Sequence, residues 1–175
     1  MIAFRETKEN DFAEIAALVQ AAFNSGIEAD LTRALLADPT AAARLSLMAQ
    51  DGDHPVGHIL FTKAGIASAK AVLLAPLSVH PVAQGQGVGG KLIDEGVQRL
   101  TSTGTDLVFV LGDPAYYSPH GFKPALQHGF RTPHPIPEEH ADAWMVLALT
   151  SGALTACGGT VRCAAALDAP ELWAG

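Results

Sequence analysis

The sequence lacks long apolar runs and basic clusters. No uninterrupted apolar stretch approaches the roughly 20 residues that a transmembrane helix needs, and Met1–Asp11 carries acidic residues and no apolar signal core. The formal net charge is −7, and no segment is rich in Lys or Arg, which argues against nucleic acid and anionic membrane surfaces as partners. We therefore expect a cytoplasmic protein with no nucleic-acid or membrane partner.

Cysteine, metal-binding and nucleophile motifs are also scarce. Cys157 and Cys163 are the only cysteines, which is too few for a disulfide framework, and their spacing is not Cys-x-x-Cys. The spacing of His128, His134 and His140 matches no standard zinc site. No Gly-x-Ser-x-Gly motif occurs. The sequence therefore predicts no metal site and no serine nucleophile.

The composition is that of a globular protein with a full core. Hydrophobic residues make up 49% of the 175 residues and charged residues 17%. We expect one domain spanning 1–175, with a core in 1–150 and a C-terminal strand and weakly ordered tail in 151–175. Periodicity predicts helices over 12–23, 27–35 and 91–102, a short helix from Asp113, and strands over 2–5, 44–49, 56–62, 71–79, 106–112, 144–149 and 160–167.

The chain is organised around residues 71–100. The continuous apolar run Ala71–Val79 predicts a strand that is covered on both faces. A glycine-rich turn at 84–90 follows, and then an amphipathic helix. Unpaired backbone N–H groups and the positive end of the helix dipole would meet at this turn, where glycines let a bulky anion approach. The stretch therefore predicts a seat for phosphate or pyrophosphate.

Two general phosphate motifs fit this turn poorly. The Walker pattern is met from Gly85 to Lys91, but Leu92 stands where Ser or Thr is required. The dinucleotide pattern GxGxxG is met by Gly85, Gly87 and Gly90, although a loop separates it from its strand and that strand is not the first of the chain. A Rossmann-type nucleotide binder stays open as an alternative. It predicts an acidic ribose ligand about 20 residues further on, where Asp106 opens a strand instead of ending one.

A third pattern, Gln/Arg-x-x-Gly-x-Gly/Ala after a strand, fits Gln84, Gly87 and Gly89 position for position. Residues 77–92 resemble the cofactor signature of the GNAT superfamily of acetyl-CoA-dependent N-acetyltransferases. Residues 112–125 are similar to its Phe-Tyr-x-x-x-Gly-Phe segment, and the resemblance covers roughly residues 1–150.

The resemblance implies an α+β (mixed α/β) fold. Its central twisted mixed sheet has about seven strands flanked by helices, and the fourth and fifth strands splay apart to hold the pantetheine arm of coenzyme A. Pro76, inside the predicted fourth strand, agrees with this arrangement. A strand that bulges and leaves its neighbour loses little when one backbone N–H is missing.

The resemblance also implies which residues hold the cofactor. Backbone amides across Gln84–Gly90 would bind the pyrophosphate, backbone groups of Leu77 and Val79 would pair with the pantetheine arm, and an N–H near Val79 would stabilise the oxyanion. The cofactor-binding residues expected on this basis are Leu77, Ser78, Val79, Gln84, Gly85, Gln86, Gly87, Val88, Gly89, Gly90 and Tyr117.

Tyr117 holds the position of the family's tyrosine, four residues before Gly121. A phenol with a pKa near 10 is protonated at neutral pH and suits a general acid for the leaving thiolate. The alternative is that Tyr117 only packs against the cofactor or the core, and Tyr116 is expected to point inward.

The general base and the acceptor contacts stay open. Many relatives place a Glu on the central strand, but Val72–Val79 contains no acid. The candidates for the base or for substrate contact are Glu28, His58, Asp113 and His120, with Ser78 as a further base and Asp30 and Arg33 as further contacts. The enzyme would otherwise bind the neutral fraction of its amine.

The function implied is N-acetyl transfer from acetyl-CoA to a primary amine of a small-molecule or peptide acceptor. Direct attack in a ternary complex fits the lack of a nucleophile motif. We expect acetyl-CoA as cosubstrate, no metal, and a homodimer as a common arrangement. A non-catalytic acyl-CoA-binding sensor or regulatory module of the same fold stays open as the alternative, because the central strand has no acid.

Overall fold

The computed structural model describes residues 1–175 and contains one seven-stranded sheet, in the order β1-β2-β3-β4-β5-β8-β6. The strands of this sheet are β1 (Ile2–Glu6), β2 (Leu45–Asp51), β3 (His54–Ile66), β4 (Ala69–Val79), β5 (Leu107–Leu111), β6 (Lys123–Pro124) and β8 (Trp144–Ala148). All neighbouring pairs are antiparallel except β4–β5, which is parallel. The predicted mixed α/β fold with about seven strands is confirmed.

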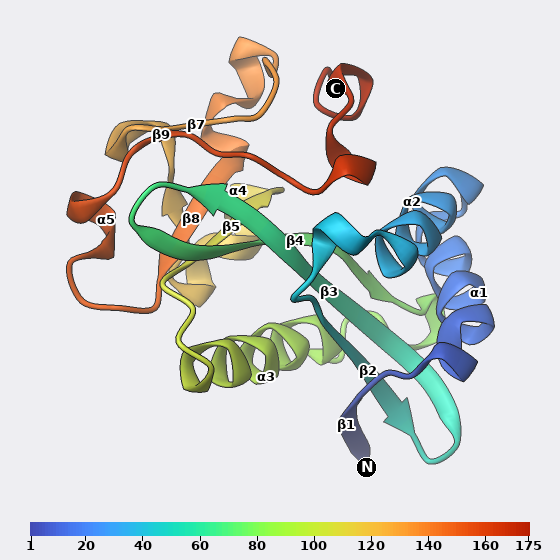
Figure 1. Cartoon of the computed structure of the whole chain (residues 1–175). Coiled ribbons are helices and arrows are strands. Elements are labelled where there is room, and N and C mark those ends of the chain that lie inside the picture. Colours follow the sequence, from blue (N-terminus) through green and yellow to red (C-terminus); the bar gives the residue numbers. More distant parts are fainter.

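Helices cover both faces of this sheet (Figure 1). Helices α1 (Phe12–Phe23) and α2 (Gly26–Ala37) pack on one face, and α3 (Val88–Ser102) packs on the other. Two short helices, α4 (Pro114–Tyr117) and α5 (Ala153–Ala156), lie in the second half of the chain. Each face has its own hydrophobic cluster. No helix has both the length and the apolar character that crossing a membrane requires.

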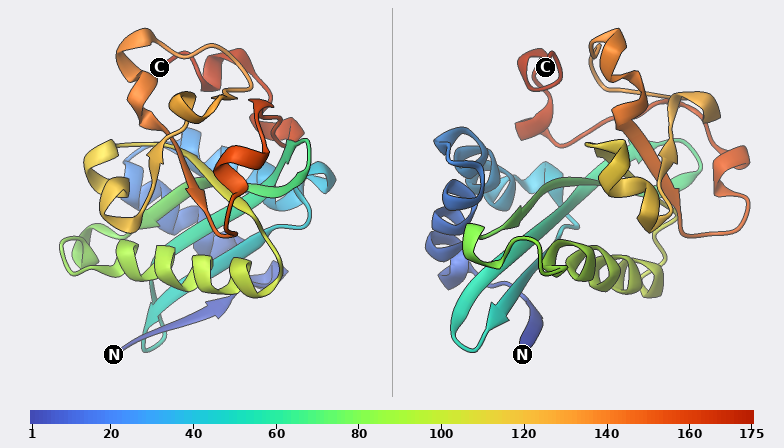
Figure 2. Two further views of the ribbon diagram at one scale, coloured as in Figure 1. Left: turned by 90° about the vertical axis from the view of Figure 1, so that its left-hand side faces the viewer. Right: turned by 180° about the vertical axis from the view of Figure 1, so that it is seen from behind.

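Two glycines let α3 lie close against the sheet. A Cβ on Gly57 of β3 would lie 2.8 Å from Cδ1 of Leu92 and 2.9 Å from Cγ1 of Val88. A Cβ on Gly96 would overlap the ring of Phe61. Because both positions lack a side chain, the helix axis approaches β3, and this contact holds the N-terminus of α3 beside the end of β4 (Figure 2).

Strands β4 and β5 diverge halfway along β4. Their pairing runs only from Ala71 with Leu107 to Leu74 with Val110. On the other side of β4, the register with β3 shifts between Leu74 and Leu77, which marks a bulge. Pro76 lies within this bulge, where no ladder bond needs its missing N–H. The predicted splay between the fourth and fifth strands is confirmed.

The predicted strand over 160–167 is wrong. Only Gly159–Thr160 is a strand (β9), and it pairs with β7 (Phe130–Arg131) outside the main sheet. Beyond Thr160 the only further pairing is a single antiparallel bridge between Arg162 and Gly65. Val161, Ala164 and Leu167 are buried at intervals of three residues, so the rest of the segment packs its apolar side chains on the core in a turning conformation.

The C-terminal tail was expected to be weakly ordered. In the structure Trp173 instead packs it against the core. The indole Nε1 of Trp173 donates to the carbonyl of Leu167 at 2.9 Å, and its ring meets Trp144 edge to face at 5.7 Å between centroids. Only 4% of Trp173 is exposed. The last residues of the chain therefore belong to the packed structure beside β5 and α2.

Candidate functional site

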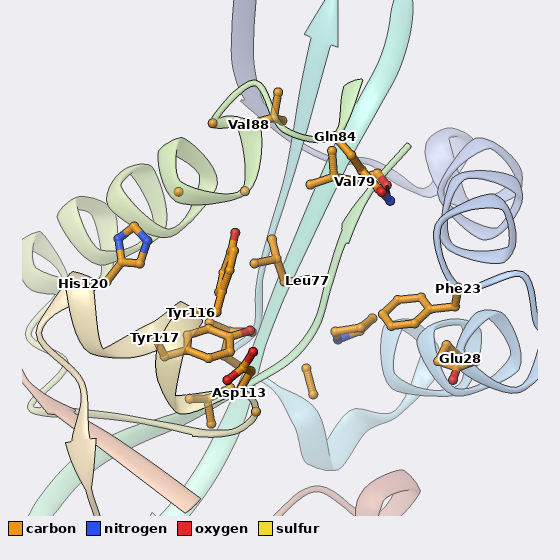
Figure 3. A pocket seen from close by; sticks show the side chains of 18 of the residues that line it. Phe23, Glu28, Leu77, Val79, Gln84, Val88, Asp113, Tyr116, Tyr117 and His120 are labelled. Atoms are coloured by element: carbon orange, nitrogen blue, oxygen red, sulfur yellow. Dashed lines mark hydrogen bonds between the residues drawn. The ribbon is translucent and has the colours of Figure 1, made fainter. Parts of the chain in front are cut away.

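A cleft of about 930 Å³ opens where β4 and β5 diverge (Figure 3). This volume is near the upper end of the range of ~300–1,000 Å³ that is typical of ligand pockets. Four segments line the cleft: the last part of β4, the start of α3, the end of β5 with α4, and the corner between α1 and α2. The side chains of Leu77 and Val79 face into it from β4.

The start of α3 presents free backbone donors to the cleft. Gly85 and Gly87 adopt positive φ values of 77° and 80°, which turn the chain into the helix. No protein acceptor is found for the backbone N–H groups of residues 85–90. The side chains of Gln84 and Gln86 bond instead to the carbonyls of Val79 and Val82, at 3.0 and 3.3 Å. Free N–H groups and the helix dipole together make an anion seat.

Tyr116 and His120 stand beside this seat. The hydroxyl of Tyr116 reaches Gly89, and Cε1 of His120 would lie 3.1 Å from a Cβ on Gly90. Tyr116 is 41% exposed, so the expectation that it points inward is wrong. The structure also places His120 beside the first turn of α3, on the far side of the cleft from the α1–α2 corner (Figure 3).

Tyr117 is the buried member of the tyrosine pair, at 8% exposure. Its ring packs edge to face on Tyr116 and on Phe122, with centroids 5.1 and 5.5 Å apart. Gly112 makes room for it, because a Cβ there would overlap the Tyr117 ring. Burial, and next the neighbouring Tyr116, raise the pKa of Tyr117 above its ordinary value. The phenol lines the cleft and stays protonated at neutral pH.

The opposite wall carries Phe23 and Glu28, from the corner between α1 and α2. Ser25 caps α2 by accepting a hydrogen bond from the N–H of Ile27, and this turn brings Glu28 to the cleft. Oε2 of Glu28 is closed to solvent and has no hydrogen-bond partner in the protein. A carboxylate oxygen in that state is costly unless a ligand satisfies it. The sequence predicted Glu28 as a candidate substrate contact, but it did not distinguish Glu28 from Asp30 and Arg33 on the same helix.

Three other candidates from α2 and α4 have different surroundings. Asp30 and Arg33 form an ion pair of 3.1 Å with side chains 78% and 58% exposed, and neither lines the cleft. Asp113 does line the cleft, but its Oδ1 accepts the N–H of Ala115 at 2.9 Å and so caps α4. The carboxylate of Asp113 therefore has a structural role as the N-cap of α4.

His58 and Ser78 lie in the core and do not line the cleft. They sit opposite one another on β3 and β4, on the face that α1 and α2 cover. The Nε2 atom of His58 is 2.8 Å from Oγ of Ser46, and burial lowers the pKa of His58 to about 4. His58 cannot touch a substrate, so its prediction as a substrate contact is wrong. Gln86 also does not line the cleft.

The residues that do line the cleft include most of those expected to bind the cofactor. From β4 and the glycine-rich turn they are Leu77, Val79, Gln84, Gly85, Gly87, Val88, Gly89 and Gly90. The structure contains no group of three or more His, Cys, Asp or Glu side chains arranged to hold a metal ion.

Comparison with known proteins identifies the family of this chain. Residues 12–122 match the Acetyltransferase (GNAT) family. The chain is 44% identical over 166 residues to the uncharacterized N-acetyltransferase YjhQ of Escherichia coli strain K12, covering 92% of this chain and 91% of YjhQ. The chain therefore belongs to the GNAT family of acetyltransferases.

Two solved structures of the same family are similar over nearly the whole chain. The GNAT family N-acetyltransferase YhbS from Escherichia coli, in complex with CoA, is 30% identical with a TM-score of 0.86, covering 96% of this chain and 92% of that one. A GNAT family acetyltransferase from Brucella melitensis, in complex with acetyl-CoA, is 31% identical with a TM-score of 0.75, covering 96% and 99%.

Proposed function

We propose that this protein transfers the acetyl group of acetyl-CoA to a primary amine by direct attack in a ternary complex. The observation that carries the proposal is the set of free backbone N–H groups at 85–90, at the mouth of the split between β4 and β5. Relatives of the same fold solved with CoA and acetyl-CoA support it. The bound thioester supplies an activated carbonyl, and its C–S bond breaks as the C–N bond to the amine forms.

The cofactor would be held mainly by backbone groups. The N–H groups of 85–90 would bind the pyrophosphate, and the Tyr116 hydroxyl and the His120 imidazole stand within reach of the same anion. The edge of β4 that faces β5 is unpaired beyond Leu74, so the backbone of Leu77 and Val79 would pair with the pantetheine arm as a further strand would. An N–H of β4 beside the acyl carbonyl, closer to Leu77 than the N–H near Val79 that the sequence led us to expect, would then stabilise the oxyanion.

Tyr117 would act as the general acid. Its raised pKa keeps the phenol protonated, and it faces the middle of the cleft from α4. A proton donated by this hydroxyl to the leaving sulfur prevents an alkyl thiolate from being released as an anion.

Glu28 would bind the acceptor amine. Its unpartnered oxygen suits an ammonium group, and it takes up the proton that the amine must lose before attack. Since His58 is buried in the core and Asp113 caps α4, Glu28 is the best-placed acid on the acceptor side. A sensor module would need the anion seat alone, so the pair of Tyr117 and Glu28 on facing walls favours an enzyme over a sensor.

The test combines binding and turnover. Acetyl-CoA should raise the thermal unfolding temperature of the purified protein and NAD should not. Release of free thiol should then identify an acceptor among polyamines, aminoglycosides, amino acids and peptides with free N-termini. Stabilisation by NAD and not by acetyl-CoA would remove the assignment, and binding of acetyl-CoA without transfer to any amine would favour the sensor.

A further inference from the structure

A second, smaller cavity adjoins the cleft at the foot of the split. This cavity has a volume of about 150 Å³, and every residue that lines it is apolar. It shares Leu74, Ala75 and Leu111 with the large cleft. Leu74 is the last residue of β4 that pairs with β5, so the two spaces meet where the strands part.

Helix α2 and the C-terminal tail form one wall of the cavity. Leu31 lines it from α2, and Leu172 and Trp173 line it from the tail. Trp173 is held by its hydrogen bond to Leu167 and its contact with Trp144, so this wall is fixed. An apolar cavity of ~150 Å³ in another protein stays dry and binds benzene, which sets the capacity of such a space at about six carbon atoms.

The direction of the cleft indicates what enters the cavity. With its pyrophosphate at the start of α3, a thioester arm lying along β4 runs from Val79 toward Ala75. Its acyl end then points to the foot of the split, where the cavity opens. The amine would approach the carbonyl from the side of Phe23 and Glu28, which line the cleft but not the cavity.

We propose that this cavity receives the alkyl chain of the donor, so that the protein accepts linear acyl-CoA thioesters of about four to six carbons and binds them more tightly than acetyl-CoA. The proposal rests on the proposed function and extends its donor. The chemistry of transfer is unchanged: the C–N bond forms at the acyl carbonyl, the C–S bond breaks, and CoA leaves as the thiol.

Calorimetric titration with acetyl-, butyryl-, hexanoyl- and decanoyl-CoA tests the proposal on the wild-type protein. Burial of one methylene contributes ~0.8 kcal/mol, so each added methylene should tighten binding about fourfold up to hexanoyl-CoA, with no further gain at decanoyl-CoA. A dissociation constant that stays level or rises from acetyl- to hexanoyl-CoA would overturn the proposal.

Two variants fill the cavity from different walls. Leu31→Phe and Leu172→Phe should each erase the gain from acetyl- to hexanoyl-CoA. Ile27→Phe is the matched control, because Ile27 lies on α2 with 69% exposure and does not line the cavity. Thermal unfolding of each variant checks that it is folded. A gain that survives in both filled variants would contradict the assignment.

The rival occupant is an apolar part of the acceptor. In that case acetyl-CoA with a series of linear alkylamines would show KM falling with chain length, Leu31→Phe would erase that trend, and the donor assignment would be wrong. Binding of acetyl-CoA without any effect of acyl length removes this inference alone. If no CoA thioester binds, both this inference and the proposed function fall.

Discussion

The hydroxyl oxygen of Tyr116 occupies the space that a Cβ atom on Gly89 would need. The two residues come from α4 and from the first turn of α3, and the contact joins the two sides of the anion seat. Gly89 is helical, so its lack of a side chain here serves close approach and not an unusual backbone angle.

Gly89→Ala should therefore displace Tyr116 and weaken binding of coenzyme A about tenfold or more, since overpacking typically costs ~1–3 kcal/mol. Calorimetric titration measures the effect. The double variant Gly89→Ala with Tyr116→Phe removes the overlapping oxygen and should lose less affinity than the sum of the single changes. Wild-type affinity in the Gly89→Ala variant would show that the contact has no bearing on the seat.

Tyr117→Phe should lower kcat by about 100-fold or more while the dissociation constant of acetyl-CoA changes little, because only the proton donor is lost. Thiol release at saturating acetyl-CoA gives kcat, and titration gives the affinity. Turnover equal to that of the wild type would reduce Tyr117 to a packing residue between Tyr116 and Phe122.

Glu28→Gln should lower kcat/KM for the amine by about tenfold or more, because hydrogen bonds to charged groups contribute ~1.5–3 kcal/mol, and it should leave acetyl-CoA affinity unchanged. Asp30→Asn is the matched control: it removes a carboxylate from the same helix, at a site that does not line the cleft. Equal losses in the two variants would point to the charge of α2 in general and not to a contact with the amine.

Gly96→Ala should destabilise the fold by ~1–3 kcal/mol, because the added methyl group overlaps the ring of Phe61 beneath α3. Gly26→Ala at the start of α2 meets no atom within 4 Å and should be neutral or stabilising by up to ~1 kcal/mol. Urea unfolding of both variants compares them. A Gly96→Ala variant as stable as Gly26→Ala would mean that α3 shifts away from β3 at little cost.

Stability should fall as the pH is lowered from 6.5 toward 4, because of His58. The unfolded state binds a proton at His58 below its ordinary pKa of 6.5, whereas the folded state stays neutral down to a pKa of about 4. The group therefore stabilises the fold fully above 6.5, and about 2 kcal/mol is lost between pH 7 and pH 5. Urea unfolding across this range measures the loss. A His58→Gln variant with the same pH dependence would assign it to other groups.

The sequence was sufficient to predict the split between β4 and β5 and the glycine-rich start of α3, because both depend on local features. Pro76 inside an apolar run and the order Gln84, Gly87, Gly89 carry that information directly. The buried tyrosine was not predictable from periodicity, because α4 has only four residues and Tyr116 and Tyr117 are adjacent in it. Which one faces the core depends on Gly112, on a different segment.

The acceptor wall and the tail depend on tertiary contacts that no local pattern records. Glu28, Asp30 and Arg33 all suit a substrate-facing helix by residue type, and only the packing of α2 separates them. Trp173 belongs to a tail that was expected to be weakly ordered, yet its ring packs on Trp144, which is distant in the sequence. His58 suited catalysis by its ordinary pKa, but its place on β3 turns it toward the helices of the opposite face.

Only four residue pairs join β4 to β5. The main sheet therefore consists of two parts, which we call leaves, β1–β4 and β5-β8-β6, connected by this short stretch of pairing. A molecule lying in the gap would add main-chain bonds to one leaf and side-chain contacts to the other. Its arrival would therefore change the cooperativity between the leaves more than their average shape, and amide exchange on either side of the gap would slow together.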